Sequence, residues 1–152
     1  MKTLVKTKIL DPRLGEEFPL PEYATHGSAA VDLRAMCEDM VIIPPMQQCT
    51  FPTGMAIQIQ VPGVAGYVLP RSGLGAKHGL ILGNGTGLID PDYQGEIKVC
   101  IWNRSPTAQA INPGDRIAQM VFMPFYTAMF QVVDEFDSTT ERGVGGFGHT
   151  GR

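Results

Sequence analysis

The chain has 152 residues, of which 43% are hydrophobic and 18% charged, enough for the core of one domain, while two domains would be crowded. Its 18 glycines and 12 prolines interrupt the chain too often for long helices or a coiled coil. The formal net charge of −3 argues against a protein that coats nucleic acid through a basic surface, so we expect no direct binding of DNA or RNA.

Alternating apolar and polar side chains predict several short strands. Val5 and Ile9 show the pattern weakly, residues 55–61 and 97–101 show it clearly, and residues 117–123 read as a nearly continuous buried strand. In 55–61 the side chains of Ala56, Gln58 and Gln60 are expected to face away from the core. Turn signals separate the strands at 10–13, 44–45, 61–63, 90–92 and 112–115. The spacing predicts an all-β domain, an antiparallel sandwich, jelly roll or barrel.

Residues 72–78 are the only segment that reads as a helix, with Ser72 as its N-cap and Gly79 as its C-terminal stop. The apolar periodicity ends at Asp134, and residues 139–152 contain five glycines and little that can pack. We therefore predict a β domain over residues 1–138 and a mobile glycine-rich tail over residues 139–152.

The interval 40–70 contains no charged residue, but five prolines and four glutamines within it exclude a membrane helix. Its composition predicts strands covered on one side by the core and on the other by a neighbouring subunit. Residues 1–6 lack the apolar region of a secretion signal, so we expect a cytoplasmic protein that does not bind membranes.

Two segments place groups suited to phosphate chemistry close together. Residues 70–75 combine the cation of Arg71, the hydroxyl of Ser72 and free backbone N–H groups at a helix start, which suits an anion. The alternative is an ordinary capped turn with Arg71 in a surface ion pair. Residues 84–96 form a polar loop in which Asp90 can serve as a general base, the alternative being a hairpin in which 90–92 only make the turn.

Three further segments are weaker alone. The tail matches G-x-G-x-x-G, but no strand precedes it and no helix can follow, which excludes a dinucleotide fold. Its glycines can wrap phosphates beside Arg142, with Phe147 and His149 covering a base. The alternative is that the tail is disordered. In residues 29–35, Asp32 and Arg34 would by default form a structural ion pair. In residues 114–119, Gln119 needs a partner if it is buried.

Taken in order, these five segments resemble the five motifs of the homotrimeric deoxyuridine triphosphate nucleotidohydrolase (dUTPase) family. The resemblance runs from about Ile9 to Gly151 and includes residues 23–25 and the turn 92–95. It implies a jelly-roll-like β trimer whose active sites are shared between subunits. It also implies hydrolysis of dUTP to dUMP and pyrophosphate, which keeps uracil out of DNA and supplies dUMP for thymidylate synthesis.

The resemblance assigns roles at the phosphates. Asp90 activates the water that attacks the α-phosphorus, and Ser72 donates to the oxygen that leaves with pyrophosphate. Arg142 from the tail acts as an arginine finger. Magnesium is bound by the phosphates and water, and Asp32 orients a metal-bound water instead of ligating directly. The remaining phosphate-binding residues by resemblance are Arg71, Gly73 and Gln119.

For the nucleoside, the resemblance places uracil in a hairpin between Asn84 and Lys98, where Asn84 and backbone groups read the base. Tyr93 packs under the deoxyribose and leaves no room for a 2′-hydroxyl. Phe147 stacks on the base when the tail closes over the site. The sugar site is lined by Leu88 and Ile89.

The sequence departs from the family pattern at Ala30, Val31 and His149, where glycine, a larger residue and serine are usual. Two other readings stay open. A dCTP deaminase of related fold would need a further acid–base system for the cytosine amine, and the turn at Tyr93 and the complete tail favour the hydrolase. A non-enzymatic β-sandwich binding module would keep the alternation but would not need the phosphate groups.

Overall fold

The computed structural model of the chain describes residues 3–146, which form antiparallel strands with two short helices. The helices are α1 (Arg13–Glu16) and α2 (Ser72–His78). The strands are β1 (Val5–Ile9), β2 (Val31–Arg34), β3 (Val41–Ile43), β4 (Gln48–Ile59), β5 (Val64–Pro70), β6 (Leu80–Leu82), β7 (Gly87–Ile89), β8 (Glu96–Asn103), β9 (Gln109–Ile111) and β10 (Arg116–Pro124).

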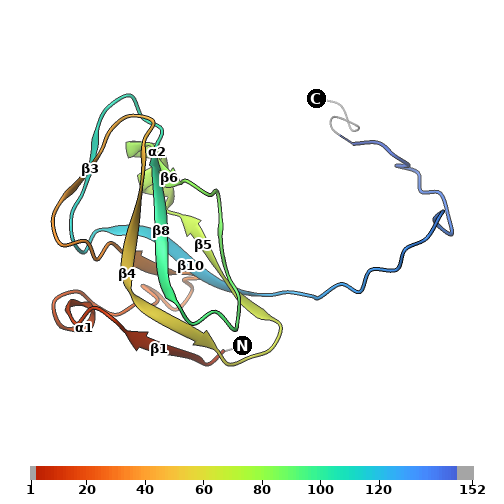
Figure 1. Ribbon diagram of the computed structural model, residues 1–152, viewed down its shortest axis with the longest axis horizontal. Coiled ribbons are helices and arrows are strands. Elements are labelled where there is room, and N and C mark those ends of the chain that lie inside the picture. The colour runs from red at the N-terminus through yellow and green to blue at the C-terminus, as the bar shows by residue number, and fades with distance from the viewer. Residues whose placement is uncertain (1–2, 147–152) are drawn as a thin grey trace.

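Two four-stranded sheets form the body, one ordered β1-β4-β8-β6 and the other β2-β10-β5-β7, and β3 pairs with β9 in a small third sheet. In Figure 1, β4 and β8 cross in front of β5 and β10. Both four-stranded sheets contribute to one apolar core, because their inward residues form a single buried cluster. The all-β, jelly-roll-like class is thus confirmed.

Strand β8 confirms the predicted alternation, since Ile97, Val99 and Ile101 are all buried while Lys98 is exposed. Strand β4 runs from Gln48 to Ile59, and Met55, Ile57 and Ile59 belong to the buried core cluster as predicted, whereas Val61 lies beyond the strand and is 38% exposed. Ala56 is also buried but is not part of that cluster; it pairs with Lys8 of β1 and with Glu96 of β8.

Helix α2 has the predicted bounds, and Gly79 ends it in the left-handed conformation with φ 67°. The prediction of Ser72 as N-cap is wrong. Arg71 is the N-cap residue, with extended backbone angles, and no side chain caps the helix. Ser72 is already inside the first turn, so its exposed hydroxyl is not used in capping. The short element α1 was not predicted; its backbone departs from helical angles at Leu14 and Gly15, so it carries no helical period.

The last strand, β10, ends at Pro124, and the N–H of Phe125 donates to the carbonyl of Gly63 at 2.8 Å. Beyond this contact the chain runs away from the body as an extended segment (Figure 1). Several large apolar side chains of this segment are at least nine-tenths exposed: Tyr126, Met129, Phe130, Val132 and Phe136. Among residues 3–146, no helix has the length and apolar character needed to cross a bilayer.

Candidate active site

A cavity of about 280 Å³ lies where the chain passes from β7 to β8. Its size is near the lower end of small-ligand pockets, about 300–1,000 Å³. It brings together five residues predicted for the nucleoside or for catalysis, and its lining is Leu88, Ile89, Asp90, Tyr93, Glu96, Ile97 and Lys98. The predicted hairpin is wrong: β7 pairs with β5 and β8 with β4 and β6, so the cavity lies between strands of different sheets.

Tyr93 is held at both ends by backbone contacts. Its N–H donates to the carbonyl of Asp90 at 3.1 Å, closing the predicted turn, and its hydroxyl donates to the carbonyl of Glu96 at 3.0 Å. The side chain is nonetheless 44% exposed. Tyr93 therefore forms a wall of the cavity whose position is set by short-range hydrogen bonds.

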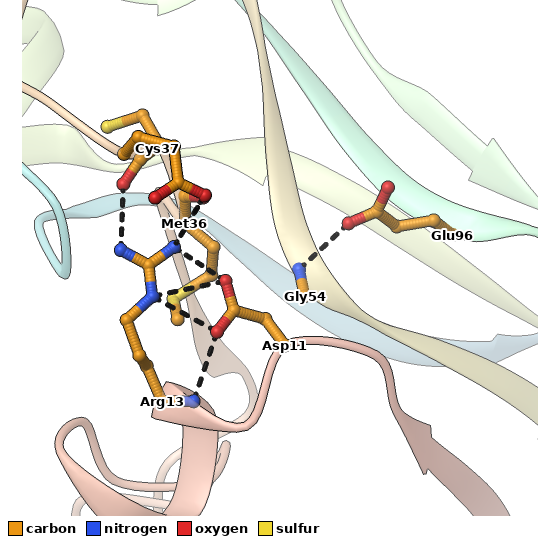
Figure 2. Close-up of polar contacts among 7 residues, drawn as sticks. Asp11, Arg13, Met36, Cys37, Gly54 and Glu96 are labelled. Atoms are coloured by element: carbon orange, nitrogen blue, oxygen red, sulfur yellow. Dashed lines mark hydrogen bonds and ion pairs between the residues drawn. The ribbon is translucent and has the colours of Figure 1, made fainter.

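Glu96 lines the cavity but was not identified from the sequence, where it follows the turn without any distinguishing pattern. Its Oε1 accepts a hydrogen bond from the N–H of Gly54 at 3.1 Å, as Figure 2 shows. Its Oε2 lies 4.0 Å from Nζ of Lys98. The carboxylate thus joins the start of β8 to the irregularity in β4 and leaves Asp90 as the more exposed acid at the cavity.

The same part of β4 is tied to the N-terminal segment. Leu10 and Asp11 both donate backbone N–H groups to the carbonyl of Gly54. Arg13 donates to the Asp11 carboxylate at 2.6 Å and to the carbonyls of Met36 and Cys37, each at 3.1 Å (Figure 2). The hydrogen bond from Arg13 lowers the pKa of Asp11 below its ordinary value.

Asn84 lies in the loop between β6 and β7, where its Nδ2 donates to the carbonyl of Thr86 at 3.3 Å. It is exposed and is not among the residues that line the cavity. The structure therefore does not bring its side chain to the cavity in one chain.

A second group of polar residues, which we call the charge cluster, consists of Asp32, Arg71 and Arg116. Asp32 Oδ1 lies 2.8 Å from Nε of Arg71, and its Oδ2 lies 3.2 Å from Nη1 of Arg116. Arg71 also donates from Nη1 to the carbonyl of Arg116 at 3.1 Å. Two guanidinium groups around one carboxylate leave a net positive charge at the surface, which favours an anion.

Strand register explains the charge cluster. In the pairing of β10 with β2, Gln119 lies opposite Asp32, and in its pairing with β5 it lies opposite Leu69. The side chain of Gln119 has the hydrogen-bond partner that the sequence called for: its Nε2 donates to the carbonyl of Pro70 at 2.9 Å. Arg71 comes directly after Pro70, followed by Ser72 and by Gly73, beside which a Cβ would meet open space.

Two sequence expectations change here. The default ion pair between Asp32 and Arg34 does not form; Arg34 donates instead to the carbonyl of Gly114 at 2.7 Å. Arg116, to which the sequence assigned no role, pairs with Asp32 in place of Arg34. Arg116 and Asp32 are 84 residues apart, so only the register of β2 against β10 reveals the contact.

Comparisons with known proteins decide the family. Residues 16–151 match the family model described as dUTPase. The chain belongs to the dUTPase family. It is 57% identical over 148 residues to the "Deoxyuridine 5'-triphosphate nucleotidohydrolase" of Tolumonas auensis, with 97% of each chain covered. It is also 57% identical over 151 residues to the protein of that name from Shewanella baltica strain OS185, with 99% of each chain covered.

A solved structure of a dUTPase has the same fold. Staphylococcus bacteriophage 80alpha dUTPase with dUPNHPP superposes with a TM-score of 0.81 at 26% sequence identity, covering 98% of this chain and 99% of that one. The family predicted from the five motifs is therefore confirmed by both sequence and fold.

In this dUTPase-family chain, the cavity and the charge cluster lie at opposite ends of β5. Ile89, next to Asp90, pairs with Gly66, and Arg71 follows five residues farther along the chain. At about 3.3 Å per residue, that places roughly 16 Å of strand between them. Asp90 and Arg71 of one chain therefore lie beside different ends of β5.

The dUTPase tail is described only in part. Arg142 is exposed on the extended segment, where its Nε donates to the carbonyl of Gly145 at 2.9 Å. The extended segment that carries Arg142 runs away from the body of its own chain (Figure 1), and Arg142 is not among the residues that line the cavity. Phe147, expected to stack on the base, and His149 lie outside the described residues.

Proposed function

We propose that this protein hydrolyses dUTP to dUMP and pyrophosphate by attack of water on the α-phosphorus, and thereby keeps uracil out of DNA and supplies dUMP for thymidylate synthesis. The observation that carries the proposal is the cavity that brings Asp90 and Tyr93 together beside Leu88, Ile89 and Lys98. The curated relatives that are 57% identical over nearly the whole chain are named for this reaction. Enzyme and substrate class follow from these two observations together.

Within the cavity, Asp90 is the general base that takes a proton from water. An aspartate carboxylate is ionised at neutral pH and is able to accept that proton. Tyr93 forms the wall under the deoxyribose, and Leu88 and Ile89 line the sugar site. The backbone at Lys98, which lines the cavity, and the exposed amide of Asn84 read uracil; for Asn84 this role rests on the resemblance of its segment to the family motif.

At the phosphates, Arg71, Gly73 and Gln119 hold the chain of oxygens, and the positive charge cluster supports this role. The hydroxyl of Ser72 does not cap the helix, so it is available to donate to the oxygen that leaves with pyrophosphate. Arg142 completes the charge stabilisation as an arginine finger, and Phe147 covers the base when residues 139–152 close over the site. The boundary between the body and this tail, at 138/139, belongs to the same proposal.

These residues fit a magnesium ion that is bound through water and phosphates, not one held by a set of protein ligands. Within residues 3–146 there is no group of three His, Cys, Asp or Glu side chains that could hold a metal ion. Asp32 is a single carboxylate with 29% side-chain exposure, which suits Mg²⁺ bound largely by phosphates and water. Asp32 would hold the ion through water, and bound Mg²⁺ would neutralise charge on the phosphates.

The assembly is a homotrimer with shared active sites. In one chain, Asp90 lies near the Gly66 end of β5 and Arg71 follows the other end, about 16 Å of strand away, which supports sites that take Asp90 from one subunit and Arg71 from another. The exposed apolar side chains at 126–136 provide surface for a neighbouring subunit. Light scattering tests the trimer, and a monomer at the concentration of full activity would contradict it.

An assay with four nucleotides tests the reaction. The protein is incubated with dUTP, dCTP, UTP or dTTP and Mg²⁺, and pyrophosphate and the base are measured. We expect pyrophosphate from dUTP well above the other three. Conversion of cytosine to uracil would instead identify a deaminase, and inactivity on all four would favour a binding module. The cytoplasmic location and the absence of nucleic-acid binding remain predictions from the sequence.

A further inference from the structure

Gly95 lies against the hydroxyl end of the Tyr93 ring. A Cβ atom at position 95 would come within 2.6 Å of Cζ of Tyr93 and closer still to its hydroxyl oxygen. Real Cβ atoms do not approach other heavy atoms this closely, so any side chain at position 95 must displace the ring. The ring is also anchored at its far end, because its hydroxyl donates to the carbonyl of Glu96.

The backbone at Gly95 does not itself require glycine. Its φ is not among the positive values, unlike those of Gly54 and Gly79. An alanine at position 95 would therefore meet no strain from a positive φ, and the nearest atoms that a Cβ there would meet all belong to Tyr93. Gly95 is also not among the residues that line the cavity, so it can act on a ligand only through its neighbours.

We infer that Gly95 is a positioning residue for sugar selection: by leaving room for the Tyr93 ring, it allows Tyr93 to reach the carbonyl of Glu96 and stand as the cavity wall. This inference rests on the proposed role of Tyr93 toward the deoxyribose. With a side chain at position 95 the ring leaves that place and its hydroxyl loses the Glu96 carbonyl. The wall against a 2′-hydroxyl is then lost although Tyr93 is still present.

The test uses Gly95→Ala in the full-length protein and two measurements. The ratio of kcat/KM for dUTP to kcat/KM for UTP should fall about tenfold, the usual size of a lost steric contact with a small group. Independently, ¹⁹F NMR of protein labelled with 3-fluorotyrosine should show a shifted Tyr93 resonance. The chain has four tyrosines, so Tyr93→Phe assigns that resonance.

Two further variants isolate the contact. In a Tyr93→Ala background, Gly95→Ala has no ring to displace and should leave the ratio unchanged, so the two substitutions are non-additive. Gly27→Ala is the matched control, because Gly27 also lacks a positive φ and a Cβ there meets open space. It should keep both the ratio and the Tyr93 resonance of the parent.

An unmoved Tyr93 resonance in Gly95→Ala overturns the inference. A shifted Tyr93 resonance with an unchanged ratio of kcat/KM for dUTP to UTP also overturns it, and shows that the ring does not select the sugar. The proposed dUTP hydrolysis is tested separately, by release of pyrophosphate from dUTP by the parent protein. If Gly95→Ala does not fold, recovery of the fold in the double variant with Tyr93→Ala supports the collision, and a double variant that is also unfolded contradicts it.

Discussion

The cavity and the charge cluster are built in opposite ways. In the cavity, Tyr93 is fixed by contacts that span three residues, to Asp90 and Glu96, and no charge is needed to hold it. In the charge cluster, Asp32 meets Arg116 across 84 residues of sequence and is held by ion pairs. The difference teaches that changes in the cavity should alter which nucleotide fits, while changes in the charge cluster should alter how strongly phosphates are held.

The largest expected effect comes from removing a part that belongs to neither region. Deletion of residues 142–152 takes away Arg142 and Phe147 but no part of the core, which ends with β10. Turnover of dUTP should fall on the order of 10³-fold or more, as for loss of an arginine finger. Circular dichroism and light scattering should show the parent fold and assembly. Full activity, or an unfolded product, would contradict the assignment of the tail.

Within the cavity, Asp90→Asn tests chemistry without changing shape. The amide cannot take the proton from water, so kcat should fall by about 10²- to 10⁴-fold. Calorimetry with a non-hydrolysable dUTP analogue should give an affinity close to that of the parent. Near-normal turnover would exclude Asp90 as the base.

Within the charge cluster, Arg71→Ala removes a phosphate-binding cation. We expect kcat/KM to fall by about 10²-fold, the scale for one lost donor at a developing charge. The parent kcat/KM should also decline as salt is raised, since the charges of the cluster are partly exposed and are therefore screened. Arg71→Lys keeps the charge but not the planar guanidinium, and should recover only part of the loss. An unchanged kcat/KM in Arg71→Ala would remove Arg71 from the site.

Mixing the last two variants sharpens the comparison further. If Asp90 and Arg71 of one site come from different subunits, trimers co-expressed from Asp90→Asn and Arg71→Ala contain some sites with both parent residues. In a random equal mixture about three quarters of the trimers are mixed and each has one intact site, so about a quarter of the parent activity should return. A mixture as inactive as its components would show that both residues act from one chain.

Tyr93→Ala should mainly change selectivity. A ribonucleotide must displace the ring or bury its 2′-hydroxyl unpaired, which costs about 1–3 kcal/mol. Removing the ring should lower the preference for dUTP over UTP in kcat/KM by about tenfold or more, and dUTP affinity by less. Kinetics with both substrates and both proteins measure this. An equal ratio in parent and variant would place sugar selection elsewhere in the cavity.

The smallest effect is expected at Asp11, which touches neither region. Asp11→Asn weakens the contact with Arg13 and should lower the Tm by about 2–4 °C at neutral pH, leaving the ratio of dUTP to UTP unchanged. The pKa of Asp11 is lowered in the fold, so its stabilisation is present above the ordinary value of 3.8 and is lost as pH falls through the lower folded value. Calorimetric melts should therefore show the Tm difference at pH 7 and its disappearance in strong acid.

The sequence by itself determined the features that depend on neighbouring residues. Alternation at Ile97, Val99 and Ile101 specified a half-buried strand, and the turn at Asp90 and the left-handed end at Gly79 followed from their local residue types. The order of the motifs identified the family, because motif residues keep their spacing along the chain.

Only the tertiary structure decided the features that depend on register and on packing between sheets. Whether β7 and β8 pair with each other, whether Arg116 meets Asp32, and how far Asp90 lies from Arg71 all follow from contacts between segments far apart in sequence. The contact between Gly95 and Tyr93 is local, yet glycine at that place reads only as a turn residue until the ring position is known. Periodicity records which face of a strand is buried, whereas the partner across the sheet is set by the energy of the whole packed core.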